Sequence, residues 1–186
     1  RYRVAILLAA DAGLRIGEIR ALEWSAVNEV QRELSISQSV DRSGNLGPTK
    51  SWGSREIAIS SRLWDALSNL ERSERWILSR STGSTTKPLG YETTRQAILA
   101  SYKSAKVKVP PKPWHGLRHC FGSTLSNQGV PIAEIKELMG HQSIETTLGY
   151  IHTTRAAKRE AISRLALALY GIEAPEKEKT LAKLLT

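Results

Sequence analysis

Residues 138–152 read LMGHQSIETTLGYIH and place His141 and Tyr150 on either side of a run that is typical of a short helix. The tyrosine could either pack into a core or act as a nucleophile. A phenol has a pKa near 10, so only about one part in a thousand is ionised at neutral pH. Attack on a phosphodiester would therefore require a nearby base, a proton donor for the departing oxygen, and cations around the phosphoryl oxygens.

The composition favours an anionic partner. The chain has 186 residues, with 27 Lys and Arg against 18 Asp and Glu, which gives a formal net charge of +9. This length supports one compact domain, and a surplus of this size makes a polyanion the natural partner. A basic surface that serves only solubility would have the same composition.

Cys120, the single cysteine, cannot form an internal disulfide, so we expect a reducing compartment such as the cytoplasm. No stretch approaches the roughly 20 apolar residues that a membrane-spanning helix needs. The apolar run at 4–10 is short and is followed at once by Asp11, which is typical of a core helix rather than a signal segment. Because residue 1 is Arg rather than Met, we expect the chain to be a fragment or a processed product.

Apolar residues recur at helical spacing in the first part of the chain and throughout its last third. The pattern predicts helices at 2–10, 16–26, 62–71, 91–106, 115–128, 131–139, 143–150 and 154–170. Gly129, Pro131 and Gly140 mark boundaries between these later helices. The chain is thus expected to be mainly helical.

Strands are predicted where apolar and polar residues alternate, at 33–40 and 54–60. Together they suggest a β-hairpin with a long, mobile connection. We expect a further short strand at 75–79 and a loop at 80–90, which is rich in Ser, Thr and Gly. Three prolines exclude a regular helix at 106–113. The fold class is therefore α+β, mainly α, with a small antiparallel β-sheet.

Two further motifs carry residues suited to phosphate chemistry. HGLRHC, at 115–120, places His115 and Arg118 three residues apart on one face of a helix. AGLRIGEIRAL, at 12–22, places Arg15 at the junction of two helices, where it could also cap a helix or pair with Glu18. A guanidinium binds phosphate oxygens bidentately and keeps its charge at physiological pH. Each motif alone is also compatible with ordinary surface or capping roles.

The ordered set of motifs resembles the catalytic domain of tyrosine recombinases, the phage integrase family. The matching pieces are AGLRIGEIRAL, PTKSWGSREIAI, HGLRHCFGSTL and LMGHQSIETTLGYIH. They occur in the family's order, and the resemblance covers about residues 4–152. It implies that residues 1–170 form the catalytic domain and that 171–186 form a linker and tail.

The resemblance implies a catalytic set consisting of Arg15, Lys50, His115, Arg118, His141 and Tyr150. The two arginines and His141 are expected around the non-bridging oxygens of the scissile phosphate. Lys50 matches the general acid for the 5′ oxygen, and Tyr150 matches the nucleophile that forms a covalent 3′-phosphotyrosyl link.

The remaining matched positions have supporting roles. His115 is expected to act as a base or hydrogen-bond partner, and Glu18 to support the first arginine. Two arginines and a lysine would occupy the role that Mg²⁺ has elsewhere, so we expect no metal and no cofactor. Arg55 competes with Lys50 for the role of general acid, but its near-permanent charge makes it a poor proton donor.

The chain departs from the family pattern at two positions outside the catalytic set. Gly116 stands where many relatives carry an acidic residue, and Cys120 stands where threonine is common. A zinc site at His115 and His119 is an alternative, but a zincin would need Glu at position 116. A type IB topoisomerase and a non-catalytic DNA-binding module of the same fold remain further alternatives.

The implied partner is double-stranded DNA. Four lysines near the basic connection, Lys103, Lys106, Lys108 and Lys112, are candidate phosphate contacts. Family members usually carry an N-terminal DNA-clamping domain, which we expect to be missing here, and the resemblance implies a homo-oligomer, a tetramer, on DNA. The apolar stretch TLAKLLT after EKEK suggests a tail that docks onto a neighbouring protomer.

Overall fold

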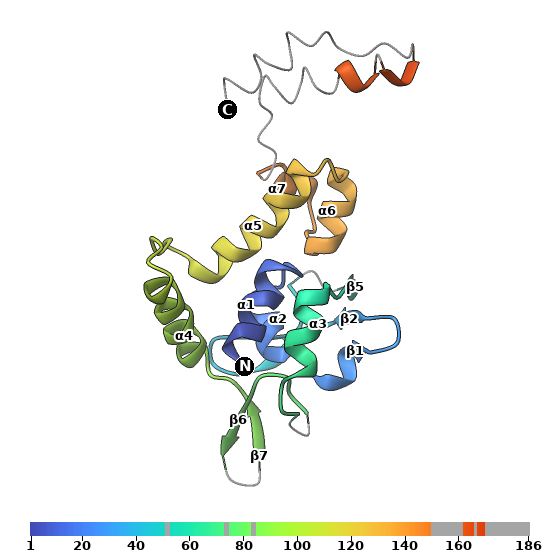
Figure 1. Cartoon of the computed structure of the whole chain (residues 1–186). Helices are drawn as coiled ribbons and strands as arrows, with labels where there is room; N and C mark the ends of the chain where they lie inside the picture. The colour runs from blue at the N-terminus through green and yellow to red at the C-terminus, as the bar shows by residue number, and fades with distance from the viewer. Residues whose placement is uncertain (51–52, 73–74, 83–84, 150–161, 166, 170–186) are drawn as a thin grey trace. The chain divides into compact units, whose positions relative to one another are not determined.

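The structure is a computed structural model, and it describes the chain except for residues 51–52, 73–74, 83–84, 150–161, 166 and 170–186. The chain divides into two compact units, Arg1–Tyr150 and Ile151–Thr186. The named helices and strands belong to the first unit, in which α1, α2 and α3 lie beside the small strands β1, β2 and β5 (Figure 1). This arrangement confirms the predicted α+β class.

Two helices joined by a tight turn open the fold. α1 spans Tyr2–Ala10, and α2 spans Ile16–Ala21. Between them Gly13 has φ +63°, and a Cβ there would lie 2.4 Å from the Phe121 ring. Only glycine adopts this backbone without strain while allowing so close a contact. The helix predicted at 16–26 ends early, at Ala21, because the backbone of Leu22 is extended, and η1, Trp24–Ala26, follows it as one 3₁₀ turn.

The central sheet has the order β1–β2–β5 and is antiparallel. β1 spans Val27–Asn28, β2 spans Glu33–Ile36, and β5 spans Arg55–Ala58. In this register Ile36 pairs with Arg55 and Leu34 with Ile57. The predicted pairing of the first half of 33–40 with 54–60 is confirmed.

The connection between the two paired segments has structure of its own. β3, Gln38–Val40, pairs with β4, Leu46–Pro48, in a separate two-stranded sheet. The prediction of one continuous strand at 33–40 was wrong, because the chain leaves the central sheet at Ser37. Alternation of polar and apolar residues does not reveal which neighbour each half of a strand pairs with.

The prediction of a loop at 80–90 was also wrong. β6, Ser79–Thr82, and β7, Thr85–Pro88, form an antiparallel hairpin, which extends away from the helices of the first unit in Figure 1. Threonines at 82, 85 and 86 favour extended backbone, and this preference outweighs the loop-like composition. The expected strand at 75–79 reduces to one bridge between Glu23 and Trp76 before β6.

Five further helices complete the first unit. They are α3, Ser61–Ser68; α4, Tyr91–Ser104; α5, Pro113–Asn127; α6, Ile132–Met139; and α7, Ile144–Leu148. Pro113 starts α5, where its missing N–H costs nothing, and Gly140 ends α6 with φ +59°. The predicted helix at 154–170 falls mostly outside the described residues, and 162–165 and 167–169 are helical.

The main core joins α1, α2 and α3 to one face of the central sheet. Its fully buried members include Leu8, Ile19, Leu34 and Leu63. A smaller cluster of Ile135 and Met139, with Phe121 against it, fastens α6 to α5. None of the helices in the described part of the chain is long and apolar enough to span a bilayer.

Candidate active site

An open cleft of about 800 Å³ lies beside α2, the β3–β4 sheet and the start of α5. Its walls include four of the residues predicted from the sequence, namely Arg15, Lys50, His115 and Arg118. They come from three separate segments of the chain, since His115 and Arg118 share α5, so the fold gathers them on one surface.

Arg15 stands at the start of α2 and is held on two sides. Its Nη1 donates to Oε1 of Glu18 at 2.9 Å, and its Nη2 donates to the Gly140 carbonyl oxygen at 3.0 Å. The backbone N–H of Arg15 also donates to Oε2 of Glu18, at 2.8 Å, so one carboxylate binds both the backbone and the guanidinium of Arg15. The side chain remains 27% exposed. The guanidinium is thus fixed while it stays accessible from the cleft.

Glu18 is buried, with its side chain 1% exposed, and has three arginine neighbours. Besides Arg15, it accepts from Nη1 and Nη2 of Arg55 at 3.2 and 2.7 Å, and Nη1 of Arg118 lies 4.0 Å from its Oε2. Burial alone would raise the pKa of this carboxyl, but the hydrogen bonds and charges of Arg55 and Arg15 outweigh burial and lower it. Glu18 is therefore a fixed anion at neutral pH.

Arg118 is almost wholly enclosed, since its side chain is 2% exposed. Nη1 donates to the carbonyl oxygen of Gly13, and Nη2 donates to that of Met139. These bonds join α5 to the α1–α2 turn and to the end of α6. The residue reaches the cleft wall while the backbone of two other elements defines its orientation.

His141 directly follows the left-handed residue that ends α6. Its Nδ1 lies 2.9 Å from the Oγ1 of Thr147, which is itself buried. Burial lowers the pKa of His141 to about 4, with further contributions from Arg118, Arg15, Arg55 and His115. At neutral pH the imidazole is therefore neutral and can donate or accept one hydrogen bond through its other nitrogen.

His141 does not line the main cleft. It lines a neighbouring pocket of about 550 Å³ between the start of β5 and the end of α6. The hydrogen bond from Arg15 to Gly140 connects the cleft to this pocket, because Arg15 lines the cleft and Gly140 precedes His141 in the chain. The second histidine is thus adjacent to the other four residues rather than on the same wall.

His115 and Lys50 are the more exposed members of the set. His115 lies in the first turn of α5, and its pKa is lowered by burial and by the positive charge of Arg118. Lys50 lies in the turn after β4, where Thr49 is buried and Lys50 is exposed. The Lys50 carbonyl oxygen accepts from Nε2 of Gln142 at 3.3 Å, which brings this turn next to the His141 segment.

The predicted nucleophile, Tyr150, lies outside the described residues, as does the expected docking tail. The four candidate DNA-contacting lysines, Lys103, Lys106, Lys108 and Lys112, are exposed between the end of α4 and the start of α5. His119, considered as a zinc ligand with His115, has its Nδ1 3.1 Å from the Oγ of Ser123. In the described part of the chain, no three His, Cys, Asp or Glu side chains are grouped as metal ligands would be.

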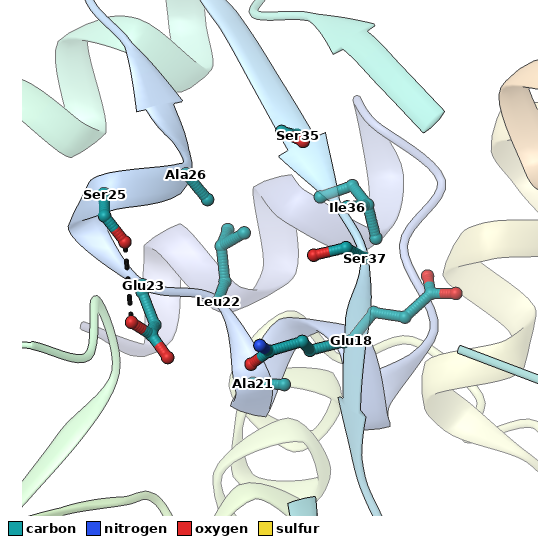
Figure 2. Close-up of a pocket in the computed structure, with 10 residues that line it drawn as sticks. Glu18, Ala21, Leu22, Glu23, Ser25, Ala26, Ser35, Ile36 and Ser37 are labelled. Carbon is teal, nitrogen blue, oxygen red and sulfur yellow. Dashed lines mark hydrogen bonds between the residues drawn. The ribbon is translucent and has the colours of Figure 1, made fainter. Parts of the chain in front are cut away.

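A third, smaller pocket of about 220 Å³ lies between α2, η1 and β2. Figure 2 shows Glu23 and Ser25 on one side, joined by a 3.4 Å hydrogen bond, with the Glu18 carboxylate on the opposite side. Glu18 therefore lines this pocket, but its carboxylate points away from Glu23 and Ser25, towards its arginine partners.

Arg55 has a structural role that the sequence motifs do not predict. The sequence offers it only as a rival proton donor to Lys50, yet its guanidinium makes the shortest of the hydrogen bonds to Glu18. The available signal was the alternation in REIAI, which turns Arg55 to the same face as Ile57. That face is buried, so the pattern indicated an inward-facing arginine that needs a partner.

The arrangement suits an anion with several oxygens. Arg15 and Arg118 supply planar donors, Lys50 supplies a mobile ammonium, and the histidines supply neutral donors or acceptors. One buried carboxylate, Glu18, offsets the charge of the three arginines around it. A phosphodiester placed in the cleft would meet fixed positive charge without the cost of reorganising it.

Known proteins are similar to this chain in sequence and in fold. The phage integrase family model matches residues 1–157. The XerC-like tyrosine recombinase of Caldanaerobacter subterraneus subsp. tengcongensis is 28% identical, with 89% of this chain and 49% of the relative covered. The tyrosine recombinase XerA of Pyrococcus furiosus is also 28% identical, with 90% and 55% covered. The chain thus spans about half the length of these relatives.

Two solved structures show the same fold. The Tn1549 transposon integrase in complex with transposon right end DNA aligns with a TM-score of 0.73 at 22% identity, with 89% of this chain and 58% of that chain covered. The catalytic domain of bacteriophage HP1 integrase aligns with a TM-score of 0.57 at 24% identity, with 89% and 83% covered. Because the family match extends over most of the sequence, the chain belongs to the phage integrase family.

Proposed function

We propose that this chain is the DNA-cleaving part of a site-specific recombinase, which breaks and rejoins DNA through a covalent 3′-phosphotyrosyl intermediate without a metal ion. The observation that carries the proposal is the cleft in which Arg15, Lys50, His115 and Arg118 meet. We further propose residues 1–170 as the catalytic domain, with 171–186 as a linker and tail.

In the proposed reaction, the Tyr150 phenolate oxygen attacks phosphorus and forms the 3′-phosphotyrosyl bond. The bond to the 5′ oxygen breaks, and Lys50 gives that oxygen its proton. Attack by a 5′ hydroxyl in the reverse direction restores the DNA, so one phosphodiester replaces another and no external energy source is needed. His115 assists the proton transfers at the tyrosine.

The charge on the phosphoryl oxygens is assigned to Arg15, Arg118 and His141. A transition state of this kind needs fixed donors around its oxygens more than it needs covalent help. Support comes from the anchoring of both guanidinium groups by backbone carbonyls and of Arg15 by Glu18. Glu18 acts by orienting Arg15 rather than by touching DNA.

Double-stranded DNA is the proposed substrate. The net charge of +9 and the exposed lysines at 103, 106, 108 and 112 support it, because neutralising backbone phosphates supplies most non-specific affinity. The Tn1549 integrase that shares the fold was solved in complex with DNA. An enzyme acting on DNA in a prokaryotic or phage-infected host would work in the cytoplasm.

Assembly belongs to the proposal as well. Since this chain covers about half of its relatives' length, we propose that a further DNA-clamping region acts together with it. Two DNA duplexes with two exchanging strands each require four active sites, so a tetramer on DNA is the proposed working state. The tail at 176–186 would dock onto a neighbouring protomer, and its deletion should weaken both assembly and cleavage.

The test is covalent trapping on a nicked suicide substrate, from which the short 5′-hydroxyl fragment diffuses away. The protein, with any flanking sequence retained, should form a protein–DNA adduct only on DNA carrying its recombination site. Tyr150→Phe should bind the same DNA but form no adduct, whereas Tyr2→Phe, a matched change at the exposed start of α1, should behave like the wild type.

Adduct formation by Tyr150→Phe would remove that residue as nucleophile. Adducts on DNA of any sequence, together with relaxation of supercoiled plasmid, would identify a topoisomerase-like activity instead. Binding without any adduct would point to a non-catalytic module of this fold.

A further inference from the structure

Arg55 joins three elements that surround the candidate active site. It opens β5, and its side chain is 9% exposed. Nη1 and Nη2 donate to Glu18 on α2, and Nε donates to the Leu138 carbonyl oxygen on α6 at 3.0 Å. One guanidinium therefore links the central sheet to two helices.

The sheet register explains why this arginine faces inward. Arg55 pairs with Ile36 and lies two residues before Ile57, so both β5 side chains are on the face that covers the core. A guanidinium on that face is stable only with a carboxylate and further acceptors within reach. Glu18 and the Leu138 carbonyl oxygen are those acceptors.

Arg55 contacts both of the residues that hold the Arg15 guanidinium, Glu18 and Gly140. Glu18, which Arg55 binds with two nitrogens, also accepts from Nη1 of Arg15. Gly140, which accepts from Nη2 of Arg15, lies directly against Arg55, because a Cβ on Gly140 would be only 2.8 Å from Nη1 of Arg55. Both anchors of the Arg15 guanidinium are therefore in contact with Arg55.

Arg55 does not touch the cleft itself. It lines the neighbouring pocket together with His141, whereas the cleft wall is formed by Arg15, Lys50, His115 and Arg118. Its influence on bound DNA must then pass through other groups. A displacement of about 1 Å at a reacting group can cost about a hundredfold in rate, so such indirect holding is significant.

We propose that Arg55 is a positioning residue for DNA cleavage, which fixes Arg15 through Glu18 and fixes the His141 segment through Leu138 and Gly140. The inference rests on the proposed function. Arg55 keeps Glu18 ionised and immobile, and Glu18 in turn keeps Arg15 aimed into the cleft.

The test compares Arg55→Gln and Arg55→Lys with the wild type in single-turnover adduct formation, using saturating DNA. Arg55→Gln should form adducts about tenfold to a hundredfold more slowly, with unchanged affinity for DNA. Arg55→Lys keeps the charge but cannot bind both Glu18 and Leu138 with a planar fork. Its rate of adduct formation should therefore lie between those of Arg55→Gln and the wild type.

The pH profile separates positioning from a general loss of structure. The charged groups facing Glu18 are Arg15 on its own helix, Arg55 on β5 and Arg118 on α5. Without Arg55, burial dominates and Glu18 takes up a proton more readily. The rate of Arg55→Gln relative to wild type should therefore fall further from about pH 8 to about pH 5.5. Adding Glu18→Gln to Arg55→Gln should abolish this additional fall.

Arg62→Gln is the matched control, since it removes an exposed arginine that pairs with Asp11, and neither residue lines the cleft. It should leave the rate and the pH profile unchanged. The inference is overturned if Arg55→Gln cleaves like the wild type, or if its loss of rate merely follows its unfolded fraction with no altered pH profile. If Arg55→Gln does not fold, an Arg55→Lys rate equal to wild type overturns it. Failure of the wild type to form any adduct would refute the proposed function separately.

Discussion

Nη2 of Arg15 donates a hydrogen bond to the Gly140 carbonyl oxygen at 3.0 Å, so the start of α2 is tied to the residue that precedes His141. The sequence separates these residues widely, yet this bond places an accessible guanidinium beside a buried imidazole. The acceptor is a backbone oxygen, so the bond does not depend directly on the side chain at position 140. The residue at this position must, however, adopt a left-handed conformation, with φ +59°.

Gly140→Ala is expected to lower both stability and cleavage. Left-handed backbone costs an L-residue about 1–2 kcal/mol, and the new Cβ would also press on Arg55. Urea unfolding and the rate of adduct formation measure the two effects. Gly44→Ala is the control, because Gly44 has φ +97° but a Cβ there meets nothing within 4 Å. Equal losses in the two variants would show that the contact with Arg55 contributes nothing.

Acid should destabilise the folded state through His141. Burial, and then the charges of Arg118 and Arg15, lower its pKa to about 4, whereas an unfolded histidine titrates near 6.5. The unfolded chain therefore binds more protons between these values, and stability is lost as the pH falls from about 7 to about 4. The loss from this one group is on the order of 3 kcal/mol.

Urea midpoints measured across that pH range check this prediction. His141→Gln should flatten the dependence, while His115→Gln, at an exposed position whose pKa is also lowered, should change it less. An unchanged slope in His141→Gln would show that the imidazole is not the group that resists protonation.

Arg118 and Arg15 should differ in how much each contributes to the stability of the protein, but both should be important for cleavage. Arg118→Ala leaves the carbonyl groups of Gly13 and Met139 without their donor inside the protein, at a cost on the order of 3 kcal/mol. Arg15→Ala removes a side chain that is 27% exposed and should cost about 1 kcal/mol. Each should slow adduct formation by about a hundredfold or more at a temperature where both are folded. Thermal unfolding beside single-turnover rates separates the two effects.

The helical parts of the site could be predicted because their signals are local. Gly13 and Gly140 each mark the end of a helical pattern, and His115 and Arg118 share a helix face through their spacing. In the structure His115 and Arg118 lie on α5, and Gly140 ends α6, as these patterns predict. The role of Tyr150 stays a prediction, since that residue lies outside the described part of the chain.

The strand pairings could not be predicted to the same extent. Residues 33–40 alternate throughout, but the first half pairs with β5 and the second with β4. A register depends on partners that are distant in sequence, and period alone does not name them. The partners of the inward-facing Arg55 could not be predicted for the same reason, because its carboxylate partner is on α2 and its carbonyl partner on α6.

Lys50 can be tested by changing the leaving group instead of the protein. A general acid matters in proportion to the basicity of the atom that departs. Lys50→Ala should therefore cleave ordinary DNA slowly but recover when the 5′ bridging oxygen of the scissile phosphate is replaced by sulfur, because a thiolate leaves without a proton. Adduct formation on the two substrates measures the recovery.

Arg15→Ala is the matched control for this experiment. Its proposed partners are the non-bridging oxygens, which the sulfur substitution leaves in place, so the substitution should not rescue it. Lys50 lines the cleft wall and its turn is held by Gln142, which supports its proposed role as the general acid. Equal recovery in both variants would mean that the sulfur substrate is simply more reactive, and the proton would then have to come from another group on the cleft.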